Sequence, residues 1–224
     1  MESGSKEIIE KTEKFVQDFF EQEATGHDWW HTHRVRKLAL RIAREEKADP
    51  FIVEMAALLH DIGDYKFSGG DEKQGQEKVA RYLNSLPLDS SLIQKILNVI
   101  TNTSFMKTLS LDDNTAIGEK SPEFKAVSDA DKLDALGAIG IARAFTYGGY
   151  YRRPIYDPGI PPNPHISQEE YKTTENPSLN HFYEKLLKLK DMMYTNYGKR
   201  LAQGRHRFIE EYLKRFYQEW RGEK

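Results

Sequence analysis

Residues 55–61 read Met-Ala-Ala-Leu-Leu-His-Asp, an apolar run that ends on a histidine and an aspartate. Such a run is typical of a buried helix. Asp49-Pro50 places an N-cap residue before a proline at the first helical position, so we predict a helix from there to His60-Asp61. Burying a pair that can carry charge costs several kcal/mol unless something compensates, and a bound cation is a common compensation.

Two other stretches carry side chains of the same kinds. His31 lies in His-Thr-His-Arg-Val (31–35), and Asp131 lies in Asp-Ala-Asp-Lys-Leu-Asp (129–134). Histidine nitrogen and carboxylate oxygen together suit divalent first-row metals, and oxygen-rich sites also admit magnesium. Each residue alone is weak evidence, because a lone helical histidine is usually a surface or hydrogen-bonded residue. An aspartate at a helix end is more often a cap than a ligand.

Composition restricts the class of protein. The chain has 224 residues, 38% of them hydrophobic and 30% charged, which is typical of one globular domain. Its formal net charge of −2 provides no global positive field, so neither nucleic acid nor an anionic membrane is an expected partner. The absence of cysteine excludes a disulfide scaffold, a thiolate zinc site and a cysteine nucleophile.

The first residues lack the ordered basic, apolar and small-residue regions of a signal peptide. No apolar run approaches the roughly 20 residues of a membrane span. We therefore expect a soluble cytoplasmic protein.

Apolar spacing and capping signals predict an all-α fold with no strand and no internal repeat. The expected helices cover residues 5–23, 29–46, 50–61, 71–85, a segment capped by residues 89–91, residues 122–145, and a last region that starts at 176. The basic side chains of the second helix are expected to face solvent; they are Arg36, Lys37, Arg41 and Arg44.

The last region shows two apolar stripes, both expected to face the core. They are Phe182, Leu186, Leu189 and Met193, and then Phe208, Tyr212, Phe216 and Trp220. Residues 146–177 form a long irregular segment rich in proline and glycine, of the kind that often serves as a lid. Its aromatic and basic side chains favour that reading; they are Tyr147, Tyr150, Tyr151, Arg152 and Arg153.

The motifs around these residues resemble a known family. Residues 28–35, 56–64 and 129–140 resemble the signature of the HD-domain superfamily of metal-dependent phosphohydrolases, in particular its bacterial YpgQ/YedJ-like subgroup. Residues 181–186 and 205–206 extend the resemblance over nearly the whole chain. It implies a single HD-type helical bundle over residues 1–224, with a core at about 25–145 and C-terminal helices at about 176–222.

The resemblance also implies the ligands of one divalent metal ion. Carried over by position, they are His31, His60, Asp61 and Asp131, while Asp129 and Asp134 are supporting or structural residues. Four such ligands would leave positions on a six-coordinate ion for water and a phosphoryl oxygen. Binuclear HD enzymes have extra histidines between the His-Asp pair and the final aspartate, but residues 62–130 contain none. We therefore predict one ion, manganese first, with magnesium, cobalt, nickel or iron as alternatives.

The same resemblance assigns further roles. It suggests Asp64 as the general acid or base, although Asp64 also fits a helix-end position. Lys66, close to it in sequence, is the other candidate catalytic residue, as a phosphate ligand. Other candidate substrate-binding residues are Arg34, Lys132, Arg143, His181, Lys185 and Arg205. Thr101-Asn102-Thr103 stands where relatives often have a histidine, which puts one family contact to substrate or water in question.

We therefore predict a phosphohydrolase of small phosphorylated metabolites, most readily nucleoside triphosphates cleaved with pyrophosphate release. A nucleoside 5′-monophosphatase or another phosphomonoesterase is an alternative. Another is a non-catalytic helical binding module that a metal ion holds together. An HD-type di-iron oxygenase would need more histidine ligands than residues 62–130 offer. The sequence does not predict an oligomeric state.

Overall fold

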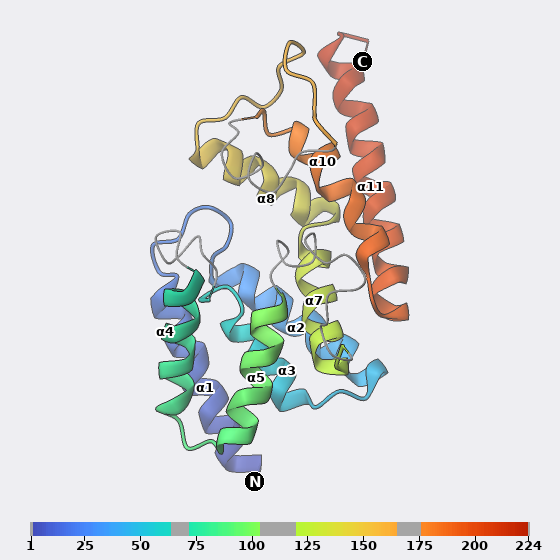
Figure 1. The fold of residues 1–224 in the computed structure, drawn as a ribbon. Helices are drawn as coiled ribbons and strands as arrows, with labels where there is room; N and C mark the ends of the chain where they lie inside the picture. The colour runs from blue at the N-terminus through green and yellow to red at the C-terminus, as the bar shows by residue number, and fades with distance from the viewer. Residues whose placement is uncertain (1, 64–71, 104–119, 165–175, 224) are drawn as a thin grey trace. The chain divides into compact units, whose positions relative to one another are not determined.

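The computed structural model describes residues 2–63, 72–103, 120–164 and 176–223, and every regular element among them is a helix (Figure 1). The elements are α1 (Glu2–Phe19), α2 (Trp29–Glu46), α3 (Pro50–Leu59), α4 (Glu72–Asn84), α5 (Ser90–Thr103), α7 (Pro122–Asp134), α8 (Gly137–Tyr150), α10 (Asn180–Glu184), the 3-10 helix η2 (Leu186–Met192) and α11 (Asn196–Trp220). The all-α prediction is confirmed.

The chain forms two compact units. Unit 1 comprises residues 1–23 and 27–130, and unit 2 comprises residues 24–26 and 131–224. The assignment of residues 1–224 to a single domain stays a prediction. None of the described helices is long and apolar enough to cross a membrane.

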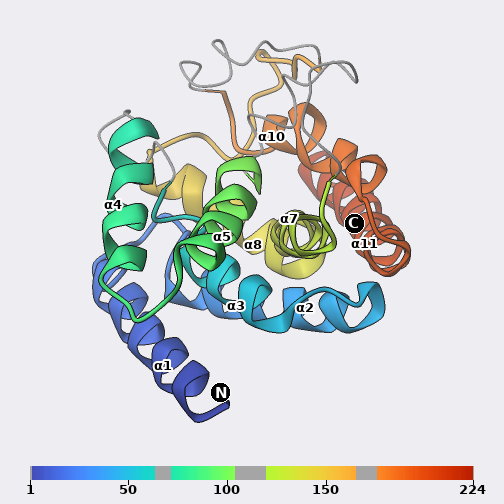
Figure 2. The ribbon, with the colours of Figure 1, turned by 60° about the horizontal axis from the view of Figure 1, so that its bottom comes forward.

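Helix α3 forms the centre of unit 1, where it packs against α1, α2 and α5 (Figures 1 and 2). Every side chain from Met55 to Leu59 is fully buried, as the apolar run predicts. The Asp49 carboxylate accepts hydrogen bonds from the backbone N–H groups of Phe51 and Ile52, so the predicted N-cap is confirmed. The helix ends at Leu59, with His60 as its C-cap.

Helix α2 begins and ends where the sequence predicts. The Asp28 carboxylate caps its N-terminus by accepting a hydrogen bond from the His31 N–H at 2.8 Å. One side chain on α2 that we predict to face solvent is instead largely covered, since only 19% of the Arg36 side chain is exposed. Arg36 donates to Glu54 Oε1 from Nε at 2.8 Å and forms an ion pair with Glu13. The prediction for Arg36 is wrong because acidic partners from α1 and α3 face it, whereas Lys37 is exposed as expected.

The predicted continuous helix over residues 122–145 is wrong. Helix α7 ends at Asp134, and α8 starts at Gly137, whose φ of +72° is accessible mainly to glycine. The Leu133 carbonyl at the end of α7 accepts a hydrogen bond from the Arg205 guanidinium. The sequence hides this break because the apolar spacing continues across it.

Helix α8 also extends further than predicted, to Tyr150, so the first residues of segment 146–177 are helical. The chain that follows is anchored to the start of the C-terminal region. The N–H groups of Ser178 and Leu179 donate to the carbonyls of Pro154 and Ile155 at 2.8 and 3.0 Å. Residues 165–175 lie outside the described residues, and the lid stays a prediction.

The first predicted C-terminal stripe is confirmed, because its four side chains are all buried; they are Phe182, Leu186, Leu189 and Met193. The second is wrong at both ends, since Phe208 and Trp220 are 48% and 54% exposed. The most deeply buried side chains of α11 lie on another face and include Ala202, Ile209 and Leu213. Trp220 packs edge-on against Tyr156, with ring centroids 4.9 Å apart.

Gly148 marks a close approach within unit 2. A Cβ atom there would lie 1.9 Å from Ser178 Oγ and 2.9 Å from Ser178 Cβ, so Gly148→Ala requires backbone movement. We expect this substitution to destabilise the protein by about 1–3 kcal/mol. Gly149→Ala is the matched control, because no atom lies within 4 Å of its Cβ position. It should be neutral or stabilising by up to about 1 kcal/mol through helix propensity. Thermal unfolding measures both, and equal melting temperatures for the two variants would refute the packing argument.

Candidate metal centre

Three imidazole rings surround the carboxylate of Asp61 within unit 1. His27 Nδ1 lies 3.0 Å and His31 Nε2 lies 3.2 Å from Asp61 Oδ2, while His60 Nε2 lies 3.4 Å from Oδ1. His31 comes from the first turn of α2, and His60-Asp61 follows the last turn of α3. His31, His60 and Asp61 are buried, and His27 is largely so. The packing of α2 against α3 therefore brings the histidine of one predicted motif to the His-Asp pair of another.

A hydrogen bond to the backbone orients the His60 ring. His60 Nδ1 lies 2.8 Å from the Ala57 carbonyl oxygen, which can only accept, so Nδ1 carries the proton and donates. In the neutral ring the lone pair is then on Nε2, the nitrogen that faces Asp61. A backbone carbonyl that orients a histidine in this way is a recurrent feature of metal sites.

The Asp61 carboxylate is held in its ionised form. Burial alone would raise its pKa, but the charges of His60 and His27 and hydrogen bonds from His27 and His31 hold that pKa well below its usual value. An ionised carboxylate beside imidazole nitrogens provides the donors that a divalent first-row metal binds.

The donor spacing also fits one ion. Two ligand atoms about 2.1 Å from a metal lie about 3.0 Å apart at octahedral angles and about 3.4 Å apart at tetrahedral angles. The nitrogens of His31 and His60 lie 3.2 and 3.4 Å from the nearest Asp61 oxygens. His27, His31 and Asp61 each offer a ligand atom, and these atoms all lie within 4.8 Å of one another. The chemistry and spacing of this set suit a divalent cation.

His27 is the member of this cluster that sequence reasoning missed. Two features of the sequence pointed to His27: it stands four residues before the candidate ligand His31, and it directly precedes the capping residue Asp28. Neither feature showed that the chain before α2 turns His27 towards Asp61. That turn passes through Gly26, whose φ is +87°.

The aspartates of the last motif have different surroundings. Asp131 is half-buried on α7, directly after Ala130, the last residue of unit 1. Asp129 is fully buried, and Asp134 is buried with its Oδ2 3.2 Å from Arg143 Nη1. This ion pair with Arg143 supports a structural role for Asp134. Asp131 as the fourth metal ligand stays a prediction.

The two predicted catalytic residues, Asp64 and Lys66, lie outside the described residues. Thr101-Asn102-Thr103, in place of a family histidine, ends α5. There Asn102 Nδ2 donates to the Asn98 carbonyl and Thr103 Oγ1 donates to the Val99 carbonyl, each at 2.7 Å. Both side chains therefore bond to their own helix.

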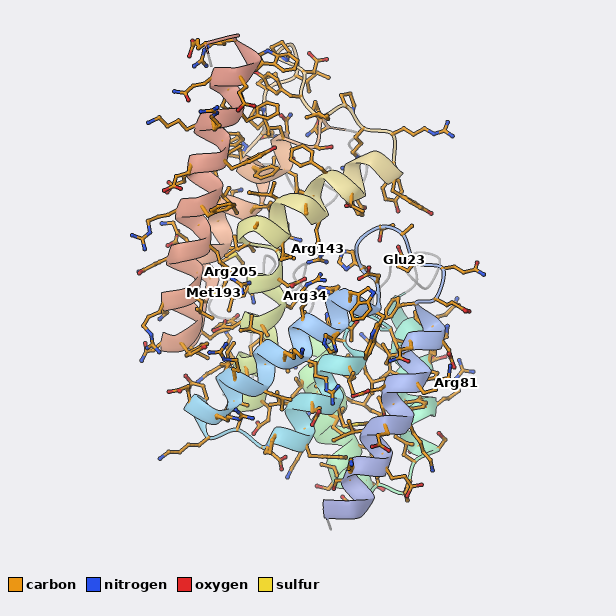
Figure 3. All side chains as sticks on the ribbon, turned by 180° about the vertical axis from the view of Figure 1, so that it is seen from behind. Glu23, Arg34, Arg81, Arg143, Met193 and Arg205 are labelled. Atoms are coloured by element: carbon orange, nitrogen blue, oxygen red, sulfur yellow. The ribbon has the colours of Figure 1, made fainter. Side chains whose placement is uncertain are left out.

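The predicted substrate-binding cations differ in their surroundings. Arg34 is half-buried on α2, one turn after His31 (Figure 3). Lys132 is buried in unit 2, with Nζ 5.1 Å from the Tyr194 ring centroid. His181 is half-buried on α10.

Two more of these cations, Arg143 and Arg205, contact the backbone or a buried acid of unit 2. Arg143 Nε donates to the Gly26 carbonyl at 2.8 Å, in addition to its ion pair with Asp134. Burial lowers the pKa of Arg205, which donates to a carbonyl at the end of α7. Lys185 is half-buried and ends α10. These contacts give Arg143 and Arg205 structural roles, and substrate binding by all three residues stays a prediction.

Comparison with known proteins now identifies the family. A family model described as the HD domain matches residues 29–136. YpgQ of Bacillus subtilis (strain 168), an uncharacterised protein, is 37% identical over 205 residues, which are 92% of this chain and 90% of the relative. The chain belongs to the HD-domain superfamily. The resemblance of its motifs to HD proteins is thereby confirmed.

Solved HD structures resemble the whole chain. An HD-superfamily hydrolase from Bacillus thuringiensis is 44% identical, with a TM-score of 0.72 over 97% of this chain and 98% of its own. A Lactobacillus plantarum protein has a TM-score of 0.83 at 33% identity, covering 96% of this chain and 97% of its own. B. subtilis YpgQ, solved in complex with ADP, has a TM-score of 0.73 at 32% identity, covering 96% of this chain and all of its own.

Proposed function

We propose that this HD-superfamily member is a divalent-metal-dependent phosphohydrolase that cleaves nucleoside triphosphates with release of pyrophosphate. The observation that carries the proposal is the buried Asp61 carboxylate with three imidazole nitrogens 3.0–3.4 Å from its oxygens. Burying charged groups in such a cluster lowers the free energy of unfolding, and a bound cation offsets this loss. The proposed ligands are His31, His60, Asp61 and Asp131.

The proposed ion is a single manganese, since residues 62–130 lack the extra histidines of a binuclear site. When bound, a divalent cation lowers the pKa of its water and polarises a phosphoryl oxygen. Groups of the protein around the site prepare the metal ligands. The Ala57 carbonyl sets the tautomer of His60, and the histidines keep Asp61 ionised.

Proton transfer and charge neutralisation are assigned to residues beyond this set. Asp64, three positions after Asp61, is the proposed group that takes the proton from the attacking water or delivers it to the leaving group. Lys66 is the proposed cation for the equatorial phosphoryl oxygens, where negative charge develops. Arg34, one helical turn after His31, is a second cation for this task.

Nucleotides are the proposed substrates because the relative YpgQ has been solved in complex with ADP. The match covers 96% of this chain and all of that relative, which supports nucleotides as the substrate class. Cleavage of a triphosphate at its α-phosphorus would yield the nucleoside monophosphate and pyrophosphate.

Product identification tests the proposal. Metal-free protein is supplied with Mn²⁺ and then with ATP, ADP or AMP, and orthophosphate and pyrophosphate are assayed separately. We expect ATP to yield AMP and pyrophosphate in equal amounts, with no product when a chelator is present. Release of orthophosphate from AMP would contradict the proposal and would indicate a phosphomonoesterase. Tight metal binding without turnover of any nucleotide would also contradict it and would indicate a non-catalytic binding module that a metal ion holds together.

A further inference from the structure

His27 lies outside the set of proposed ligands, yet its contact with Asp61 is the shortest of the three imidazole contacts described above. Its Nδ1 is 3.0 Å from Asp61 Oδ2, a hydrogen-bonding distance. The same oxygen lies 3.2 Å from His31 Nε2, and the His27 and His31 rings meet edge-on with centroids 5.3 Å apart. His27 is thus packed against one proposed ligand and bonded to another.

The direction of this hydrogen bond follows from the acceptor. An ionised carboxylate only accepts, so the proton of the bond is on His27 Nδ1. A protonated nitrogen has no lone pair for a metal. His27 can keep its hydrogen bond or coordinate through Nδ1, but it cannot do both.

Asp61 requires such a partner. The terminal torsion of an aspartate is broad, so the side-chain rotamer alone does not determine which oxygen faces which neighbour. A hydrogen bond from His27 to Oδ2 fixes that rotation and leaves Oδ1 directed at His60 Nε2, 3.4 Å away.

We infer that His27 is a positioning residue, whose Nδ1–H hydrogen bond to Asp61 Oδ2 orients that carboxylate and thereby sets the affinity of the centre for its divalent cation. The inference rests on the proposed function only in that Asp61 binds a metal. Partners that orient a ligand in this way contribute a factor of about 10–100 to metal affinity.

The residue after His27 is held in place within unit 1. Asp28 is the N-cap of α2, and its carboxylate accepts a hydrogen bond from the His31 N–H at 2.8 Å. The backbone directly after His27 is therefore fixed at the start of α2, as a positioning residue requires.

The test titrates Co²⁺ into the metal-free full-length protein and records both affinity and the visible absorption spectrum of bound cobalt. His27→Ala removes the hydrogen bond. His27→Asn retains a donor, since the amide nitrogen of asparagine overlays histidine Nδ1. His27→Gln carries its amide at the position of Nε2. His33→Asn is the matched control, because His33 lies nearby in sequence, in the first turns of α2, but packs against Trp29 and Trp30.

We expect His27→Ala and His27→Gln to bind Co²⁺ about 10–100-fold more weakly than wild type. His27→Asn and His33→Asn should stay within about threefold of wild type. The spectrum at saturation should be the same for all, because no ligand has changed. A wild-type affinity for His27→Ala would overturn the inference. A changed spectrum for both His27→Ala and His27→Asn would also overturn it, since His27 would then be a ligand.

Other outcomes separate this inference from the proposed function. If wild-type protein binds no divalent metal, the proposed function fails. If wild type binds metal and turns over nucleotides but the His27 variants bind equally well, only the inference fails. Melting temperatures measured without metal identify any variant that does not fold. If His27→Ala does not fold, the cobalt affinities of His27→Asn and His27→Gln decide whether the hydrogen bond sets metal affinity.

Discussion

Asp61→Asn should abolish tight binding of divalent metal and, with it, the rise in melting temperature that the metal gives wild-type protein. An ion that binds only the folded state at 100 times its Kd stabilises that state by about 2.7 kcal/mol. For a chain of this length, that is a rise of about 5–10 °C. The amide of asparagine carries no charge and places an N–H where one carboxylate oxygen accepts hydrogen bonds. Both changes disfavour a cation beside His31 and His60.

Differential scanning fluorimetry with and without Mn²⁺ measures this effect, and metal analysis after gel filtration measures stoichiometry. Asp18→Asn is the matched control, because Asp18 is exposed on α1, where its carboxylate forms an ion pair with Lys14. The control should keep the full metal-dependent rise. A full rise in Asp61→Asn as well would show that the metal binds elsewhere.

Asp64→Asn should reduce turnover by roughly 10²–10⁴-fold while bound metal stays normal. This is the range that a positioned proton-transfer group contributes, and asparagine cannot accept or deliver the proton. Steady-state hydrolysis of ATP, with metal content measured on the same sample, tests the prediction. Turnover near the wild-type level would contradict a proton-transfer role for Asp64.

The parts of the fold that were predictable from sequence depend on local signals. Asp28 and Asp49 each accept the backbone hydrogen bonds that define an N-cap, and such bonds form between residues close in sequence. The apolar run that ends at Leu59 has no exposed face, so its burial follows from composition. His60 and Asp61 directly follow this apolar run, so the sequence also indicated that this pair is buried.

The parts that were missed depend on contacts between distant residues. Arg36 is largely covered because Glu13 and Glu54 form ion pairs with it from two other helices. The break after Asp134 depends on a glycine with positive φ, which apolar spacing does not reveal. At the candidate site, the contact of His27 with Asp61 spans 34 positions, and only the packed structure brings the two together.

The most direct test of a one-metal phosphohydrolase is a titration of Mn²⁺ into metal-free protein, with ATP hydrolysis and bound metal followed together. The account predicts that activity and pyrophosphate release rise with bound metal and reach a plateau at about one equivalent per chain. Activity that requires two tightly bound ions about 3.5–4 Å apart would contradict the one-metal centre. Hydrolysis that persists in the chelated protein, with no bound metal, would contradict the account as a whole.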